Sequence, residues 1–162
     1  FKECFYIDRG GVMIREIAKH DLNDEYFMLL SQLSGGLSGY SVYNMWESYL
    51  KGSSKTFVYV DENNEIIGSA TIFIEYKFLH CGSTVGHIED VVVDKNSRRK
   101  GIGKALIEKC NQVAEEHGCY KVILDCSIEN IPFYAKSRFI PDAYCMRKDL
   151  KKRKKRIRED KS

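Results

Sequence analysis

The chain has 162 residues and a mass of 18.7 kDa, which is the size of a single domain. It is 43% hydrophobic and 30% charged, with 12 glycines and 2 prolines, a composition that excludes a disordered chain, a collagen-like repeat and a coiled coil. No run of 18 apolar residues occurs, so the sequence offers no transmembrane helix, and the stretch from Phe1 to Gly11 lacks the pattern of a signal peptide.

The net charge of +3 is concentrated at the C-terminal end. Residues 147–162 contain ten Lys and Arg against three Asp and Glu, which is +7 and leaves −4 for the rest of the chain. The basic run 151–156 has no apolar face, so we expect residues 149–162 to form a solvated, flexible tail. Such a tail could contact nucleic acid or a membrane surface, but no aromatic side chain interleaves it for base stacking, and we favour the solvated tail.

Six cysteines are present, and none of them is spaced as Cys-x-x-Cys. They are Cys4, Cys81, Cys110, Cys119, Cys126 and Cys145. The sequence also lacks an Asn-x-Ser/Thr glycosylation acceptor, so neither a secreted disulfide framework nor a zinc site is indicated. We therefore expect reduced thiols, most of them buried, in a cytoplasmic protein that holds no metal.

Apolar residues at helical or alternating spacing predict a mixture of strands and helices. In chain order these are a strand at 11–17, a helix at 22–34, a helix between Ser41 and Gly52, strands at 56–60 and 66–76 joined as a hairpin, a strand at 85–93, a helix at 101–117, a strand at 121–126, a short helix at 130–137 and a last strand at 139–148. Asp21 and Ser41 are the expected N-caps of the first two helices. This order predicts a mixed α/β sheet with helices on both faces.

A charged loop with two glycines joins the apolar strand that ends at Val93 to the following helix. Its sequence is Arg98-Arg99-Lys100-Gly101-Ile102-Gly103. Glycine lets the backbone approach a ligand, the first helical N–H groups have no intrahelical partner, and the helix dipole attracts anions, so the loop could hold a pyrophosphate. A P-loop is excluded by Ala105 and a dinucleotide fingerprint by Leu106. Taken alone, the loop could equally be a glycine turn with solvated charges.

Arg-x-x-Gly-x-Gly between such a strand and helix resembles the acetyl-CoA loop of the GNAT superfamily of N-acetyltransferases. Longer blocks are similar to the glucosamine 6-phosphate N-acetyltransferases: 31–34, 75–80, 86–93, 118–126, Asn130 and Phe133-Tyr134. The resemblance extends over about 12–148 and implies one acetyltransferase domain at 1–148, built on a mixed, mainly antiparallel sheet flanked by helices on both faces. The chain departs from the family at Arg138, where glycine is usual before the phenylalanine, and in its basic tail.

This resemblance implies an activity and its partners. The enzyme would transfer acetyl from acetyl-CoA to the 2-amine of D-glucosamine 6-phosphate, by direct attack of the amine in a ternary complex. The products, N-acetylglucosamine 6-phosphate and CoA, belong to the route to UDP-N-acetylglucosamine. The family further implies a cytoplasmic homodimer with sites shared across the interface, and no metal.

The same resemblance assigns four catalytic residues: Glu89, Asp90, Asp125 and Tyr134. Neighbouring strand residues point to opposite faces unless a bulge re-aims one, and in this superfamily the central strand bulges at this point. Glu89 would then position the amine and accept its proton through water, while Asp90 would bind the amine or a sugar hydroxyl. Asp125 would orient the amine, and Tyr134 would protonate the departing thiolate.

Two sets of binding residues follow from the family. The expected cofactor contacts are Val91, Val92, Val93, Arg98, Arg99, Lys100, Gly101, Ile102, Gly103, Lys104, Asn130 and Tyr134. The expected contacts to the sugar phosphate are Ser34, Lys77, His80, Glu89, Asp90, Tyr120, Lys121 and Arg147. Backbone N–H groups near Val91 and Val92 would stabilise the oxygen of the tetrahedral intermediate. From the residues alone, the same side chains could be surface charges, a structural carboxylate pair and a packed aromatic ring.

Two other functions remain open at this point. The first is a GNAT enzyme that acetylates a different amine, on a protein lysine or an arylamine. A protein substrate would need an open groove rather than a group of cations placed for a phosphate. The second is a module that binds acyl-CoA or nucleic acid without catalysis, for which Glu89→Ala and Tyr134→Phe would leave the function unchanged.

Overall fold

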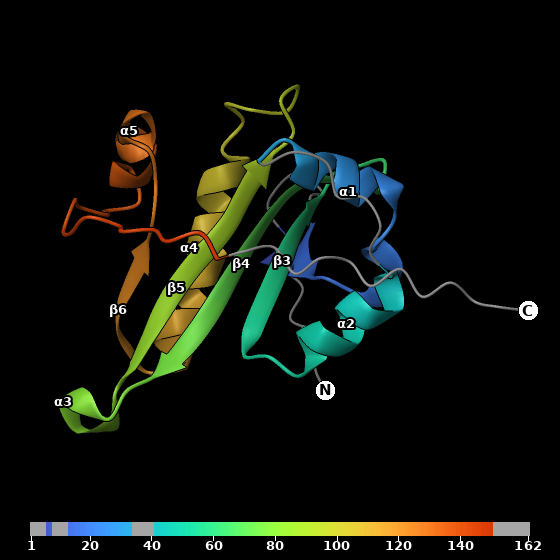
Figure 1. Cartoon of the computed structure of the whole chain (residues 1–162). Helices are drawn as coiled ribbons and strands as arrows, with labels where there is room; N and C mark the ends of the chain where they lie inside the picture. The colour runs from blue at the N-terminus through green and yellow to red at the C-terminus, as the bar shows by residue number, and fades with distance from the viewer. Residues whose placement is uncertain (1–5, 8–12, 34–40, 151–162) are drawn as a thin grey trace, which may run out of the picture.

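A computed structural model of the chain describes residues 6–7, 13–33 and 41–150 (Figure 1). Ser34, Cys4 and the basic run 151–156 lie outside these ranges. The described helices are η1 (Lys19–Asp21), α1 (Asp24–Ser31), α2 (Val42–Leu50), α3 (Leu79–Gly82), α4 (Ile102–Glu116), η2 (Ile128–Asn130) and α5 (Ile131–Ala135). None of these helices is both long and apolar enough to cross a membrane.

One sheet of six strands runs through the described part of the chain, in the order β1-β2-β3-β4-β5-β6. The strands are β1 (Tyr6–Ile7), β2 (Met13–Glu16), β3 (Ser54–Val60), β4 (Ile66–Tyr76), β5 (Thr84–Val93) and β6 (Cys119–Leu124). All neighbours are antiparallel except β5 and β6, which are parallel and joined through α4. The predicted mixed, mainly antiparallel sheet is thereby confirmed.

Helices cover both faces of this sheet, as Figure 1 shows for α4 on one side and α1 and α2 on the other. Side chains alternate along β3, so that Phe57 and Tyr59 pack in the cluster under α4, and Val58 and Val60 pack in the cluster under α1 and α2. The apolar stripe of α4, including the fully buried Leu106, closes the first cluster. Two hydrophobic layers therefore hold β4 and β5 rigidly at the centre of the domain.

The start of α1 differs from the sequence prediction, because Asp21 does not cap it. The buried Asp21 carboxylate instead accepts hydrogen bonds from the Arg15 guanidinium at 2.6 and 2.7 Å and from the Ala18 N–H at 2.7 Å. Asn23 takes over as the N-cap and accepts the N–H of Tyr26 at 3.0 Å. The cap at Ser41 is confirmed.

The strand predicted at 139–148 is wrong for the single chain. Residues 139–150 have no regular secondary structure, and nearly all of them are exposed. A strand requires a neighbour for its backbone N–H and C=O groups. Although β6 is an edge strand, this segment does not pair with it.

Candidate functional site

A β-bulge interrupts the pairing of β4 with β5 close to the C-terminal end of β5. Thr71 pairs with Glu89 and Ser69 pairs with Val92, so two residues of β5 stand opposite one residue of β4. Asp90, the first of those two, has a φ of +52°, a left-handed conformation that costs roughly 1–2 kcal/mol in a residue other than glycine. The bulge expected beside Glu89 is confirmed, and it breaks the alternation of side chains there.

The pairing of β5 with β6 ends at the same level. The last paired residues are Ile88 and Leu124, whereas β5 continues to Val93. Figure 1 shows the two strands diverging toward their C-terminal ends. The backbone groups of Glu89–Val93 that face away from β4 therefore have no partner in β6, and they can bind a ligand that enters between the strands.

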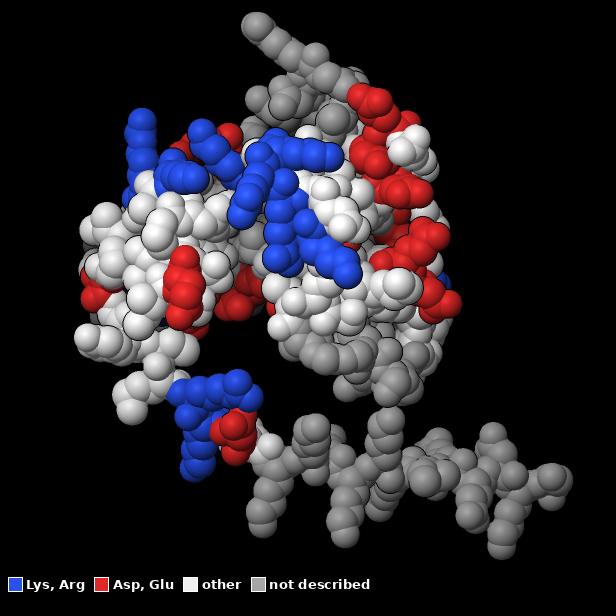
Figure 2. Space-filling model, turned by 90° about the horizontal axis from the view of Figure 1, so that it is seen from above, with Lys and Arg blue, Asp and Glu red and all other residues white. Residues whose placement is uncertain are grey.

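The charged loop follows directly and leads into α4. Gly101 has a φ of +83° and no side chain that could cap the helix, so the N–H groups of the first turn are free to bind an anion. The cations of the loop are exposed, and Figure 2 shows Lys and Arg side chains gathered on the face seen from above. One of them, Arg98, donates its Nε–H to the carbonyl oxygen of Val93 at 3.2 Å. These features fit the pyrophosphate of a nucleotide cofactor.

Three carboxylates meet where β5 and β6 separate: Glu89, Asp90 and Asp125. The pKa of Glu89 lies above its usual value because partial burial disfavours its charge and because Asp90 and Asp125 repel it. The charge on protonated His87 acts in the opposite direction. A carboxylate with a raised pKa is a stronger base, which suits a group that accepts a proton.

Tyr134 lies on α5, with its ring edge-on to Phe133 and to Phe139 at centroid distances of 4.8 and 6.2 Å. Burial raises the pKa of its hydroxyl, and negative charge on Cys126 raises it further. Since Cys126 follows Asp125 in the chain, Tyr134 lies near the segment that carries Asp125. Its phenol keeps its proton at neutral pH and can act as a donor.

Comparison with known proteins decides the family. Residues 16–139 match the sequence model of the acetyltransferase (GNAT) family. The chain belongs to this family. A relative from Trypanosoma brucei brucei, a glucosamine 6-phosphate N-acetyltransferase, is 39% identical over 140 residues that cover 85% of this chain and 95% of the relative. The enzyme of the same name from Candida albicans is 35% identical over 131 residues, which cover 78% of this chain and 87% of that relative.

Solved structures agree with the sequence comparison. The glucosamine-6-phosphate N-acetyltransferase from Arabidopsis thaliana superposes with a TM-score of 0.80 at 32% identity, over 86% of this chain and 99% of that one. An acetyltransferase from Trypanosoma brucei superposes with a TM-score of 0.79 at 39% identity, over 86% of this chain and 99% of that one. The sheet and helices of this acetyltransferase are therefore those of its family.

Four residues expected to bind the sugar phosphate, three of them from across a dimer interface, have other surroundings in the single chain. His80 and Tyr120 face each other at the other end of the sheet, with ring centroids 4.8 Å apart, and the Lys121 ammonium lies 5.8 Å from the Tyr120 ring. Lys121 pairs with Val85 on β5, four residues before Glu89, which is about 13 Å along the strand.

The fourth of these residues lies in the segment that follows α5. Within the exposed segment 139–150, the Arg147 guanidinium bonds Asp149 Oδ1 through Nη2 at 2.6 Å and through Nε at 2.8 Å. The single chain thus does not gather all the predicted substrate residues around the carboxylates.

Three residues on the same face as Glu89 form a network that the sequence analysis did not predict. The Glu75 carboxylate bonds Lys77 Nζ at 2.5 Å and His87 Nε2 at 2.7 Å, one with each oxygen. Lys77, expected to bind sugar, is thus held in an ion pair. Alternation along β5 could have identified His87, because it lies two residues before Glu89 and shares its face.

Cysteines form another feature that differs from expectation. The described thiols form no disulfide, but only Cys110 is buried and Cys119 is half-buried, so the expectation that most are buried is wrong. The Cys145 thiol donates a hydrogen bond to Asp125, whose carboxylate raises the pKa of that thiol. Residues 13–33 and 41–150 contain no cluster of three or more metal-ligating side chains.

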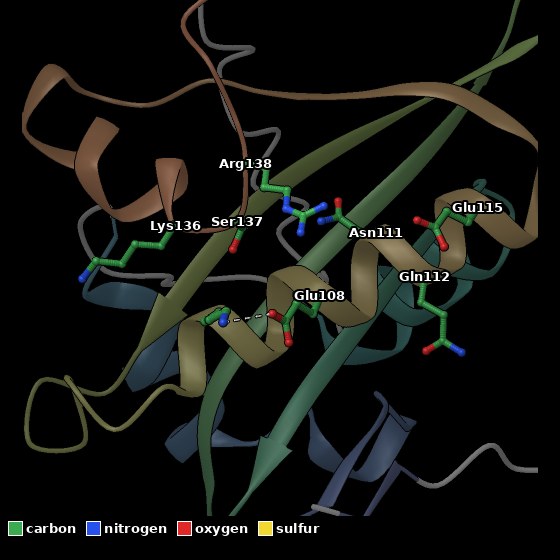
Figure 3. Close-up of a pocket in the computed structure, with 8 residues that line it drawn as sticks. Glu108, Asn111, Gln112, Glu115, Lys136, Ser137 and Arg138 are labelled. Carbon is green, nitrogen blue, oxygen red and sulfur yellow. Dashed lines mark ion pairs between the residues drawn. The ribbon is translucent and has the colours of Figure 1, made fainter.

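A groove runs along α4, between this helix and the residues after α5 (Figure 3). Arg138, the departure from the family pattern, adopts the left-handed conformation with a φ of +66°, so the turn that usually uses glycine is retained. In Figure 3 its guanidinium points toward Asn111 across the groove. Lys104 and Lys136 also line this groove together with two glutamates, so its lining carries charges of both signs.

Proposed function

We propose that this acetyltransferase transfers the acetyl group of acetyl-CoA to the 2-amine of D-glucosamine 6-phosphate. GNAT acetyltransferases use acetyl-CoA, and the relatives named above act on glucosamine 6-phosphate. The observation that carries the proposal is the bulge at Asp90. It sets Glu89 and Asp90 beside Asp125 at the point where β5 and β6 separate. The product would enter the route to UDP-N-acetylglucosamine in the cytoplasm.

Acetyl-CoA would supply a thioester whose carbonyl carbon the amine attacks. Its pyrophosphate would bind the free N–H groups of the first turn of α4 and the cations of the loop. The pantetheine arm would lie along the free edge of β5, with Asn130 and Tyr134 beside it. The proposed contacts are Val91, Val92, Val93, Arg98, Arg99, Lys100, Gly101, Ile102, Gly103, Lys104, Asn130 and Tyr134.

The chemistry requires a neutral amine, a site for the carbonyl oxygen and a proton for the thiolate. Glu89 would take the proton of the ammonium through water, helped by its raised pKa, while Asp90 and Asp125 would hold the amine. Backbone N–H groups of Val91 and Val92, released by the bulge, would stabilise the negative oxygen. Tyr134 would donate its proton to the departing sulfur. Attack would be direct, without an acetylated enzyme.

A homodimer would complete the sugar site. Phe78 at the tip of the β4–β5 hairpin and Tyr144 and Met146 after α5 are between 94 and 106% exposed, and β6 is an open edge. A second copy that covers these surfaces could bring its Lys121 and Arg147 to the phosphate. We assign the sugar phosphate to Ser34, Lys77, His80, Glu89, Asp90, Tyr120, Lys121 and Arg147. We further propose one acetyltransferase domain at 1–148 followed by a flexible tail at 149–162.

Variants of the catalytic groups test the reaction. Tyr134→Phe should lower kcat by about 100-fold, since proton donation contributes on the order of 10²–10⁴. Tyr43→Phe, an exposed phenol on α2, is the matched control and should act as the wild type. Full turnover by Tyr134→Phe would contradict the assignment. If Glu89→Ala also kept full turnover, neither side chain would be catalytic, whereas a wild-type protein that binds acetyl-CoA without turnover would favour the non-catalytic module.

The dimer has its own test. Phe78→Glu should convert the protein to a monomer in light-scattering measurements and lower its activity, because a charge would be buried in the interface. Leu50→Glu is the control, since Leu50 is an exposed apolar residue on α2, away from these surfaces. A wild-type monomer with full activity would refute the shared site.

A further inference from the structure

The side chain of Gln32 joins two parts of the chain that are 62 residues apart in sequence. Gln32 ends α1, and its Nε2 donates to Asp94 Oδ2 at 2.9 Å. Its Oε1 accepts the backbone N–H of Lys95 at 3.1 Å. The Lys95 N–H can only donate and the Asp94 carboxylate can only accept, so the amide is held in one orientation. Helix α1 is thereby tied to the first two residues after β5.

Asp94 is the central residue of this junction. Its other oxygen accepts the N–H of Asn96 at 2.9 Å, and its own backbone N–H bonds Ile67 on β4 at 2.9 Å. Hydrogen bonds from Gln32 and from the Asn96 N–H hold the pKa of Asp94 below its usual value, so the carboxylate stays ionised. Asp94 therefore sets the direction of the loop that leads to Arg98 and α4.

Helix α1 is itself fixed next to the bulge, which makes it a rigid anchor. The hydroxyls of Tyr26 and Ser69 share a buried hydrogen bond of 3.0 Å, and Ser69 pairs with Val92 immediately after the bulge. Asp90 lies close enough to Tyr26 to raise the pKa of its hydroxyl, after the larger effect of burial. The loop and the bulge are consequently attached to the same helix, at its C-terminal end and in its first turn.

We propose that Gln32 is a positioning residue for acetyl-CoA, because it fixes the start of the cofactor loop relative to the bulge. The proposal rests on the function proposed above, in which that loop binds the pyrophosphate. Gln32 does not need to touch the cofactor. Its amide is suited to the task because the junction requires one donor and one acceptor on the same side chain, and glutamate or lysine would provide only one of these.

Exchanging the amide of Gln32 and the carboxylate of Asp94 between the two positions tests the positioning role directly. Gln32→Glu removes the donor and sets two carboxylates against each other, so acetyl-CoA should bind about tenfold more weakly, the effect of losing one charge-assisted hydrogen bond. In the double variant Gln32→Glu with Asp94→Asn, the asparagine can donate to the new carboxylate and still accept the Asn96 N–H. This double variant should recover affinity to within about twofold of the wild type.

The measurements are the Kd of acetyl-CoA by calorimetry and the steady-state constants. Gln32→Glu should raise the KM for acetyl-CoA and leave kcat at saturating acetyl-CoA nearly unchanged, because Gln32 does not take part in the chemical step. Gln112→Glu is the matched control: Gln112 also bridges two side chains, Lys109 and Glu116, but on the exposed side of α4. It should bind acetyl-CoA as the wild type does.

Two results would overturn the positioning role. One is wild-type affinity for acetyl-CoA in Gln32→Glu, and the other is a loss that the double variant does not recover. A wild-type protein that does not bind acetyl-CoA would instead refute the proposed function itself, so the two failures are distinguishable.

Discussion

Replacing Gly103 with alanine should reduce turnover more than it reduces stability. Gly103 lies in the first turn of α4, where a Cβ atom would come within 2.8 Å of the Phe133 ring and 3.5 Å of Val93. An ordinary carbon–carbon contact is about 3.5–4.0 Å, so the methyl group would overlap the ring by about 0.7–1.2 Å. Phe133 is on α5 and is 37% exposed, so it can move outward.

Two opposing terms set the effect on stability. Alanine is more favourable than glycine within a helix by about 0.8–1.0 kcal/mol. Displacing Phe133 costs a similar amount, so the free energy of unfolding in urea should change by less than about 1 kcal/mol. The displacement also moves its neighbour Tyr134, and a misplacement of about 1 Å can reduce a rate by about 100-fold. We therefore expect kcat at saturating substrates to fall by about 10- to 100-fold.

A second substitution separates this cause from others. Phe133→Leu shortens the obstructing side chain, so the double variant Gly103→Ala with Phe133→Leu should regain most of the lost kcat. Wild-type kcat in Gly103→Ala would refute the reasoning, as would a kcat in the double variant no higher than in Gly103→Ala alone.

Three further predictions address pH dependence and the core. His87→Gln removes a charge that lowers the pKa of Glu89, so the acidic limb of kcat/KM should move to higher pH; a shift to lower pH would contradict the network. Burial alone would raise the pKa of Asp21, but the hydrogen bonds to its carboxylate, mainly those from Arg15, outweigh burial and lower the pKa. The Arg15–Asp21 pair therefore stabilises the fold above about pH 4, and this stabilisation is lost as the carboxylate is protonated in acid. Asp21→Asn should cost about 1–3 kcal/mol in urea unfolding at pH 7, a difference that must shrink toward pH 3. Leu106→Ala, at a fully buried position, should lower the free energy of unfolding by about 2–5 kcal/mol. A decrease of less than about 1 kcal/mol would show that α4 repacks around the smaller side chain.

The elements that depend on local chemistry were predictable from the sequence. The loop before α4 combines glycines and cations in six consecutive residues, and the apolar run 91–93 identifies a buried strand. The bulge at Asp90 was expected from the family resemblance alone, since nothing in the residues themselves requires it. Local patterns thus predicted the strand, the loop and the helix on which the proposed cofactor site depends.

Contacts between distant residues could not be predicted in this way. Gln32 and Asp94 are 62 residues apart, and neither has a local signal for the other. Asp21 has the spacing of a helix cap, but the Arg15 guanidinium competes successfully for its carboxylate. The pattern at 139–148 is typical of a strand, yet a pattern shows only that a segment can pair, and the single chain offers it no partner.

Release of free CoA from acetyl-CoA, measured with three acceptors in parallel, tests the central claim most directly. The acceptors are glucosamine 6-phosphate, glucosamine and a lysine-containing peptide. The proposed site predicts rapid release with glucosamine 6-phosphate and little with the other two, because the cations of the sugar site require a phosphate. Faster release with the peptide or with unphosphorylated glucosamine would contradict the proposed substrate.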